Sequence, residues 1–92
     1  MDGDGLAVIA LGGNAILKAG EAATEQVQMA NLEQVFQNIM PLLSSYPRLV
    51  MTHGNGPQVG NILLRNQMCQ ADIPSMPLDV CVAESQGQIA YL

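Results

Sequence analysis

Basic residues are scarce in this 92-residue sequence, which has three lysines and arginines against eight acidic residues and a net charge of −5. A chain with this balance lacks the positive surface that binds nucleic acid or an anionic membrane. Long apolar runs are also missing, since no stretch approaches the ~20 residues that a membrane span needs. The acidic start MDGDG differs from the basic start of a secretory signal. We therefore expect a cytoplasmic protein that binds neither nucleic acid nor a membrane.

Metal ligands are few and far apart in the sequence. The single histidine is His53, and the two cysteines, Cys69 and Cys81, have eleven residues between them. Zinc sites usually take cysteine and histidine in pairs at short spacing. We expect no metal site in these residues, and two reduced cysteines that serve as small apolar side chains.

Apolar residues make up 49% of the sequence, and their pattern predicts an α/β chain. LAVIAL at 6–11 and RLVMT at 48–52 are short continuous runs, typical of parallel strands that are covered on both faces. Between them we expect a helix that begins at the N-cap Thr24 and that Pro41 kinks or ends. Its apolar stripe is Leu32, Val35, Phe36, Ile39 and Leu43. The order strand, helix, strand requires a crossover connection.

Two further helices are predicted in the second half of the chain. The first runs from Pro57 or Gln58 to Cys69, and a loop follows over 71–78. The second begins near Asp79, which we interpret as its N-cap, and is still helical at Leu92. Since a stable sheet generally needs three or more strands, we expect residues 1–92 to be the first part of a larger, truncated α/β domain.

Each predicted strand ends in a glycine-rich turn, LGGNA after the first and THGNGPQVG after the second. Ligands of open parallel sheets bind outside the carboxyl ends of the strands. Glycine there permits positive φ and a close approach of backbone amides, and a following helix N-terminus favours anions. Neither turn has the lysine of a Walker A loop, and Gly54, Gly56 and Gly60 lack the dinucleotide spacing. The two turns together predict a phosphate-type site.

Three blocks of the sequence resemble the opening of a carbamate kinase, in the amino acid kinase superfamily. They are VIALGGNAIL at 8–17, MTHGNGPQVGNILL at 51–64 and PLDVCVAESQGQIAYL at 77–92. The resemblance implies a three-layer αβα sandwich with a mainly parallel sheet, whose N-terminal part binds the acyl substrate and whose C-terminal part binds the nucleotide. It also implies reversible phosphoryl transfer between ATP and carbamate, giving ADP and carbamoyl phosphate, with Mg²⁺ and in a homodimer.

The same resemblance implies which residues face the substrate and the transferred phosphoryl group. They are Gly12, Gly13 and Asn14 in the first turn and Gly54, Asn55 and Gly56 in the second. His53 is a further candidate, although we expect it to orient the turn by bonding backbone. Gln58 either reaches the substrate or is a solvated residue of the first helical turn.

No catalytic residue is predicted within these 92 residues. The single lysine, Lys18, matches no catalytic position of the family, and Ala10 stands where many superfamily members carry a lysine. We expect the catalytic lysines and the nucleotide pocket to lie beyond Leu92, so that this chain alone is inactive.

Two alternatives stay open from the sequence. One is a truncated, non-catalytic remnant that binds an anion or a partner, which the missing catalytic lysines favour. The other is a related kinase that forms an acyl phosphate on an amino acid.

Overall fold

The computed structural model describes residues 5–92, and these divide into two compact units. The first unit ends at Gly54, and the second covers Asn55–Leu92. Of the acidic start MDGDG, the first four residues lie outside the described part of the chain. Across residues 5–92, no helix is both long and apolar enough to cross a membrane.

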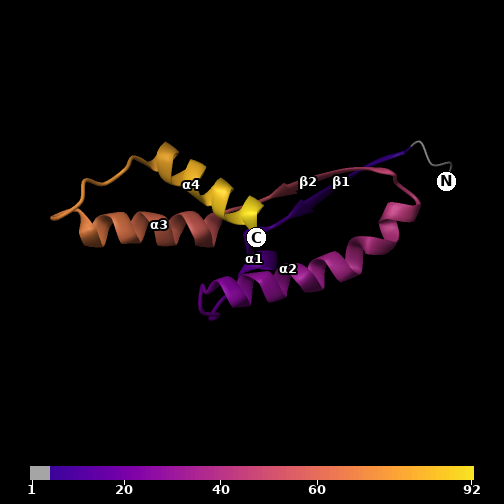
Figure 1. The fold of residues 1–92 in the computed structure, drawn as a ribbon, viewed down its shortest axis with the longest axis horizontal. Coiled ribbons are helices and arrows are strands. Elements are labelled where there is room, and N and C mark those ends of the chain that lie inside the picture. The colour runs from indigo at the N-terminus through magenta and orange to yellow at the C-terminus, as the bar shows by residue number, and fades with distance from the viewer. Residues whose placement is uncertain (1–4) are drawn as a thin grey trace. The chain divides into compact units, whose positions relative to one another are not determined.

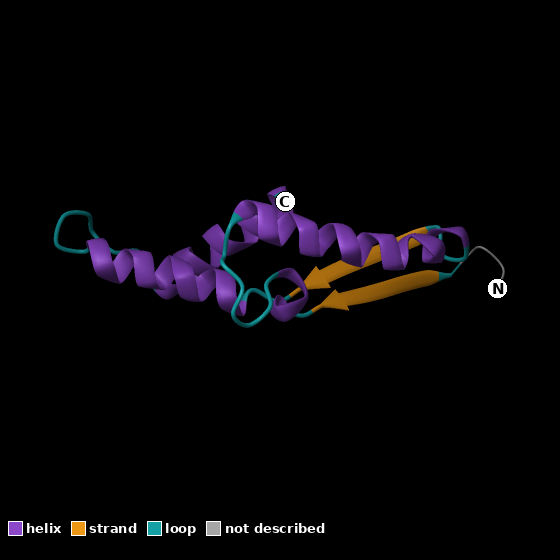
Figure 2. Cartoon of the chain, turned by 90° about the horizontal axis from the view of Figure 1, so that it is seen from below, coloured by secondary structure: helices purple, strands orange, loops and turns teal. Residues whose placement is uncertain are grey.

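Two parallel strands form the base of the first unit. They are β1 (Leu6–Leu11) and β2 (Arg48–His53), paired in register from Leu6 opposite Arg48 to Leu11 opposite His53. The connection between them contains α1 (Gly13–Ile16), α2 (Glu25–Ile39) and the 3₁₀ segment η1 (Met40–Ser44). Figure 2 shows both strand arrows pointing the same way, with α2 running alongside them. The predicted strand, helix, strand order is confirmed, and β2 is one residue longer than predicted.

The predicted ends of α2 are also confirmed. At its start, the Oγ1 of Thr24 accepts a hydrogen bond from the backbone N–H of Val27 at 3.2 Å, as an N-cap does. At its other end, α2 stops at Ile39 and η1 follows, with Pro41 in the first turn of the new segment. Because proline has no N–H to give to the preceding turn, the α-helical bonding cannot continue through it.

Within residues 5–92, the two faces of the strand pair differ in exposure. Exposure alternates along β1 and β2, and one face keeps apolar side chains in solvent. Leu6, Val8 and Val50 on this face are 52%, 64% and 45% exposed. A three-layer sandwich needs a helical layer on each face of its sheet, and the described residues leave this apolar face uncovered.

The second unit consists of two helices joined by a loop. They are α3 (Gly56–Cys69) and α4 (Leu78–Tyr91), which lie side by side (Figure 1). Asp79 is not the N-cap of α4, as the sequence suggested, but a residue of its first turn. Pro77 takes the N-cap position instead, because its extended backbone, with φ −69° and ψ 167°, leads the chain directly into the helix at Leu78.

The cysteines differ in their surroundings, although both are free. Cys81 is fully buried, and this burial, together with the nearby charges of Glu84 and Asp79, raises the pKa of its thiol. The prediction of a small apolar side chain is confirmed for Cys81. It is wrong for Cys69, which is exposed.

Asn66 ties the loop between α3 and α4 to α3. Its Nδ2 donates to the carbonyl of Ile62 at 2.8 Å, and its Oδ1 accepts from the backbone N–H of Met76 at 2.8 Å. The backbone carbonyl of Asn66 accepts a further bond from the hydroxyl of Ser75 at 3.0 Å. One asparagine therefore fixes the end of a loop of eight residues, 70–77.

We predict that Asn66→Ala loosens this loop while α3 stays helical. The Met76 amide loses its acceptor, so it should exchange with solvent faster, and the unit should lose about 1 kcal/mol of stability. Amide hydrogen exchange read by NMR measures both effects. Gln67→Ala, at an exposed position of the same helix, is the matched control. Unchanged exchange at Met76 would contradict the assignment.

Candidate functional site

The two glycine turns leave the strand pair at the same edge. Leu11 and His53 are the last paired residues of the two strands, so both turns follow at the carboxyl ends. The backbone N–H of Gly54 donates to the carbonyl of Leu11 at 2.7 Å, which continues the pairing beyond β2. The first unit thus brings together Gly12, Gly13, Asn14, His53 and Gly54.

The first turn contains a short helix that the sequence reasoning missed. Gly12 has an extended backbone, with φ −68° and ψ 157°, and α1 begins at the next residue. The N–H groups of Ala15 and Leu17 bond back to the carbonyls of Gly12 and Gly13, both at 3.0 Å. The N–H groups of Gly13 and Asn14 stand at the start of α1, where no preceding helical turn can accept their hydrogen bonds. Four residues are too few for a periodic pattern, so no sequence signal marked α1.

The glycines of the turns are not there for positive φ, which corrects the sequence interpretation. Among residues 5–92, the glycine with positive φ is Gly20, at +83°. Gly54 is instead required for a close approach, because a Cβ at this position would lie 3.0 Å from the backbone N of Gly13. A Cβ at Gly12 or Gly56 would meet nothing within 4 Å.

His53 bonds backbone, as the favoured interpretation predicted. Its Nδ1 lies 3.1 Å from the carbonyl oxygen of Gly54. Since a carbonyl oxygen can only accept, Nδ1 carries the proton in this contact. The half-buried ring of His53, the last residue of β2, therefore bonds the backbone at the start of the second turn.

In the second unit, the candidates Asn55, Gly56 and Gln58 all lie at the start of α3. Asn55 is the N-cap residue and Gly56 the first residue of the helix, one residue earlier than predicted. Gln58 is only 2% exposed, so the interpretation as a solvated residue is wrong. The Nδ2 of Asn55 donates to the Oγ of Ser85 on α4 at 2.9 Å. The sequence reasoning did not name Ser85, although it lies in the block PLDVCVAESQGQIAYL that carried part of the resemblance.

A second asparagine, Asn31 on α2, holds the first turn from behind. Its Nδ2 donates to the carbonyl of Ile16, the last residue of α1, at 2.9 Å, and to the Oε1 of Glu21 at 2.8 Å. The backbone N–H of Lys18 donates to the same Oε1 at 2.8 Å. The side chains of Ile16 and Leu17 are buried at this point. This network anchors the short helix that carries the first glycine turn.

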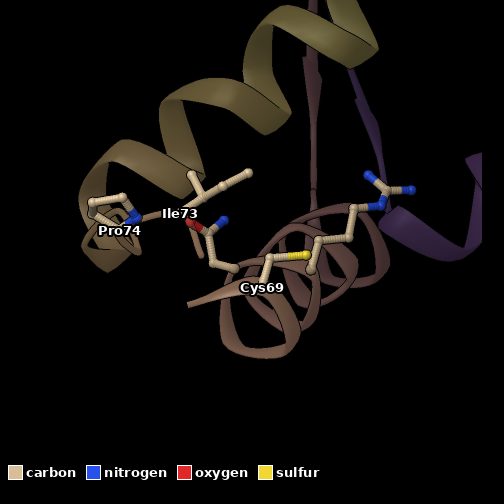
Figure 3. A pocket seen from close by; sticks show the side chains of 5 residues that line it. Cys69, Ile73 and Pro74 are labelled. Atoms are coloured by element: carbon tan, nitrogen blue, oxygen red, sulfur yellow. The ribbon is translucent and has the colours of Figure 1, made fainter. Parts of the chain in front are cut away.

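A cavity of about 220 Å³ lies elsewhere in the second unit, at the carboxyl end of α3. Figure 3 shows Cys69, Ile73 and Pro74 at this cavity, where α3 passes into the loop. Arg65 and Asn66 complete its lining. At 1.5 Å per residue, it is about 20 Å along α3 from Gly56. It is therefore separate from the start of α3, where Asn55 and Gly56 lie.

The chain is similar to carbamate kinases in sequence and in fold, although no family model matches it. Carbamate kinase 2 of Staphylococcus aureus is 47% identical over 85 residues, which are 91% of this chain and 26% of that protein. The carbamate kinase of Giardia lamblia bound to AMP-PNP matches with a TM-score of 0.89 and 46% identity, over 99% of this chain and 32% of that one. A solved protein of Aeropyrum pernix K1 matches with a TM-score of 0.84 and 38% identity, over 94% and 28% of the two chains.

These comparisons confirm the resemblance that the sequence motifs carried. The parallel strands with their glycine turns are part of an amino acid kinase fold. More narrowly, the chain is similar to a portion of carbamate kinases, and it spans about a quarter of the length of the curated relatives.

We predict that Glu21 makes the stability of the first unit depend on acidic pH. The N–H of Lys18 and the amide of Asn31 both donate to its carboxylate, and they lower its pKa below the ordinary value. A carboxyl group whose pKa is lower in the folded state than in the unfolded state stabilises the folded state. This stabilisation is complete at pH values above the unfolded-state pKa, and it is lost as the pH falls through the folded-state pKa. Unfolding experiments between pH 3 and 7 should show this loss in the natural chain and a reduced loss in Glu21→Gln. Parallel pH curves for the two chains would contradict it.

We predict opposite outcomes for two glycines that stand two residues apart. Gly54→Ala places a Cβ against the backbone of Gly13, so it should shift the Gly13 amide resonance and cost about 1–3 kcal/mol of stability. Gly56→Ala has open space and a helical position, so it should leave stability unchanged or raise it by up to about 1 kcal/mol. NMR spectra and denaturant unfolding compare the two. Equal effects would overturn the steric argument.

Proposed function

We propose that this chain is the substrate-side portion of a carbamate kinase, which transfers a phosphoryl group reversibly between ATP and carbamate. The chain matches about a quarter of the length of its curated relatives. The proposal therefore assigns the nucleotide pocket and the catalytic lysines to the remainder of such an enzyme. The 92 residues by themselves should be inactive.

The observation that carries this proposal is the pair of glycine turns at one edge of the parallel strands. In the reaction, an oxygen of the carbamate carboxylate attacks the γ-phosphorus of ATP, a new O–P bond forms, and the P–O bond to ADP breaks. Negative charge spreads over the oxygens of the phosphoryl group in transit, and fixed N–H groups stabilise it. We assign this role to the backbone amides of Gly13 and Asn14 and to those of Asn55 and Gly56. The N–H of Gly54 is already bonded to the Leu11 carbonyl, so Gly54 lines the site without donating to the phosphoryl group. The attacking atom comes from the substrate, so no nucleophilic side chain is needed.

The cofactors of the proposed reaction are ATP or ADP with Mg²⁺. A carbamate kinase relative was solved with AMP-PNP, which supports nucleotide use. Within residues 5–92, no three His, Cys, Asp or Glu side chains group to hold an ion. We therefore assign no metal ligand to this chain. The proposal includes a cytoplasmic homodimer, which rests on the resemblance to the family.

A grafted enzyme tests the function directly. The 92 residues replace the matching segment of S. aureus carbamate kinase 2, and ATP formation from ADP and carbamoyl phosphate is measured by a coupled luminescence assay. The graft should be active, and Gly54→Val should reduce kcat/KM by at least about 100-fold, because the bulky side chain displaces the amides of both turns.

The controls separate this proposal from the alternatives. Gly60→Ala, within α3 and with no atom within 4 Å of the added Cβ, should leave activity unchanged. An inactive graft that is folded would support the non-catalytic remnant. A graft that prefers an amino acid as acceptor would support the related acyl-phosphate kinase. Full activity of the Gly54→Val graft would overturn the site assignment.

A further inference from the structure

Asn55 stands at the N-cap of α3 and yet does not cap it. Asparagine is among the best N-cap residues, because its side-chain oxygen accepts a bond from an amide of the first turn. Within residues 5–92, its side chain makes no such bond, and its backbone, with φ −145° and ψ 14°, departs from the extended N-cap conformation. Its Nδ2 donates instead to Ser85, thirty residues later in the chain. The carboxamide of Asn55 therefore joins the start of α3 to α4 instead of capping α3.

Ser85 determines which end of that carboxamide faces it. The hydroxyl of Ser85 is fully buried and donates its single proton to the carbonyl of Val82 at 2.6 Å. With that proton committed, the Oγ of Ser85 can only accept, so it requires an N–H donor from Asn55. The flipped carboxamide would set two acceptor oxygens against each other. The bond thus fixes Nδ2 toward Ser85 and turns Oδ1 away from it.

We propose that Ser85 is a positioning residue for substrate choice. Its bond to Asn55 turns the Oδ1 of Asn55 toward carbamate, so that Oδ1 accepts a hydrogen bond from the amino group of this substrate. This inference rests on the proposed function. Carbamate and acetate share a carboxylate, but carbamate carries an N–H donor where acetate carries a methyl group. The oriented Oδ1 of Asn55 distinguishes carbamate from acetate, because this oxygen stays without a hydrogen bond when it faces the methyl group of acetate.

The test compares carbamoyl phosphate with acetyl phosphate as phosphoryl donors to ADP in the grafted enzyme. The unmodified graft should favour carbamoyl phosphate. Ser85→Ala should lower the ratio of the two kcat/KM values by about 10- to 100-fold, mainly through carbamoyl phosphate, because the carboxamide can then flip. Ser85→Thr keeps a hydroxyl and should restore much of the ratio. Ser45→Ala, at an exposed hydroxyl, is the control that should change neither value.

Two more measurements keep the inference falsifiable. Asn55→Ala should lower the ratio as Ser85→Ala does, and the double variant should show no further loss, because Ser85 acts through Asn55. Asn55 is only half-buried, so this variant tests the idea even where Ser85→Ala fails to fold. Equal loss with both donors, or an unchanged ratio in a folded Ser85→Ala enzyme, would overturn the inference. A graft without any carbamoyl phosphate activity would instead overturn the proposed function.

Discussion

The parallel pairing of β1 and β2 is the constraint on which the candidate site depends. Its register places Leu11 opposite His53, so the two glycine turns leave the sheet side by side. The bond from the Gly54 N–H to the Leu11 carbonyl, at 2.7 Å, extends this pairing into the second turn. A slip of one residue would exchange the two faces of a strand and carry one turn away from the other. The glycine turns are therefore neighbours because of the strand register, before any ligand is considered.

Asparagine side chains hold the segments that the register does not reach. Asn31 fixes the end of α1, Asn66 fixes the loop before α4, and Asn55 joins the start of α3 to α4. A neutral amide can give and accept hydrogen bonds at once, as Asn66 does between the Ile62 carbonyl and the Met76 N–H. This suits a chain with three basic residues against eight acidic ones, in which ion pairs can fix few connections.

The sequence predicted the parts of this structure that depend on local pattern. The two strands, the ends of α2 at Thr24 and Pro41, and the two later helices follow from apolar runs, caps and prolines. It did not predict α1, which is too short to be periodic, nor the start of α4, where Pro77 displaced Asp79 from the cap position. It also missed Ser85, because the bond to Asn55 joins residues thirty positions apart and no local pattern encodes it.

The glycines of the two turns are required for different physical reasons. Gly54 is required by the fold, since a Cβ there would press on the backbone of Gly13. Gly12 and Gly56 have open space where a Cβ would stand, so packing within these residues does not require glycine. Under the proposed function, that space belongs to the substrate and the transferred phosphoryl group, and a side chain would keep them from the amides. Packing therefore accounts for glycine at position 54, and under the proposed function ligand access accounts for it at positions 12 and 56.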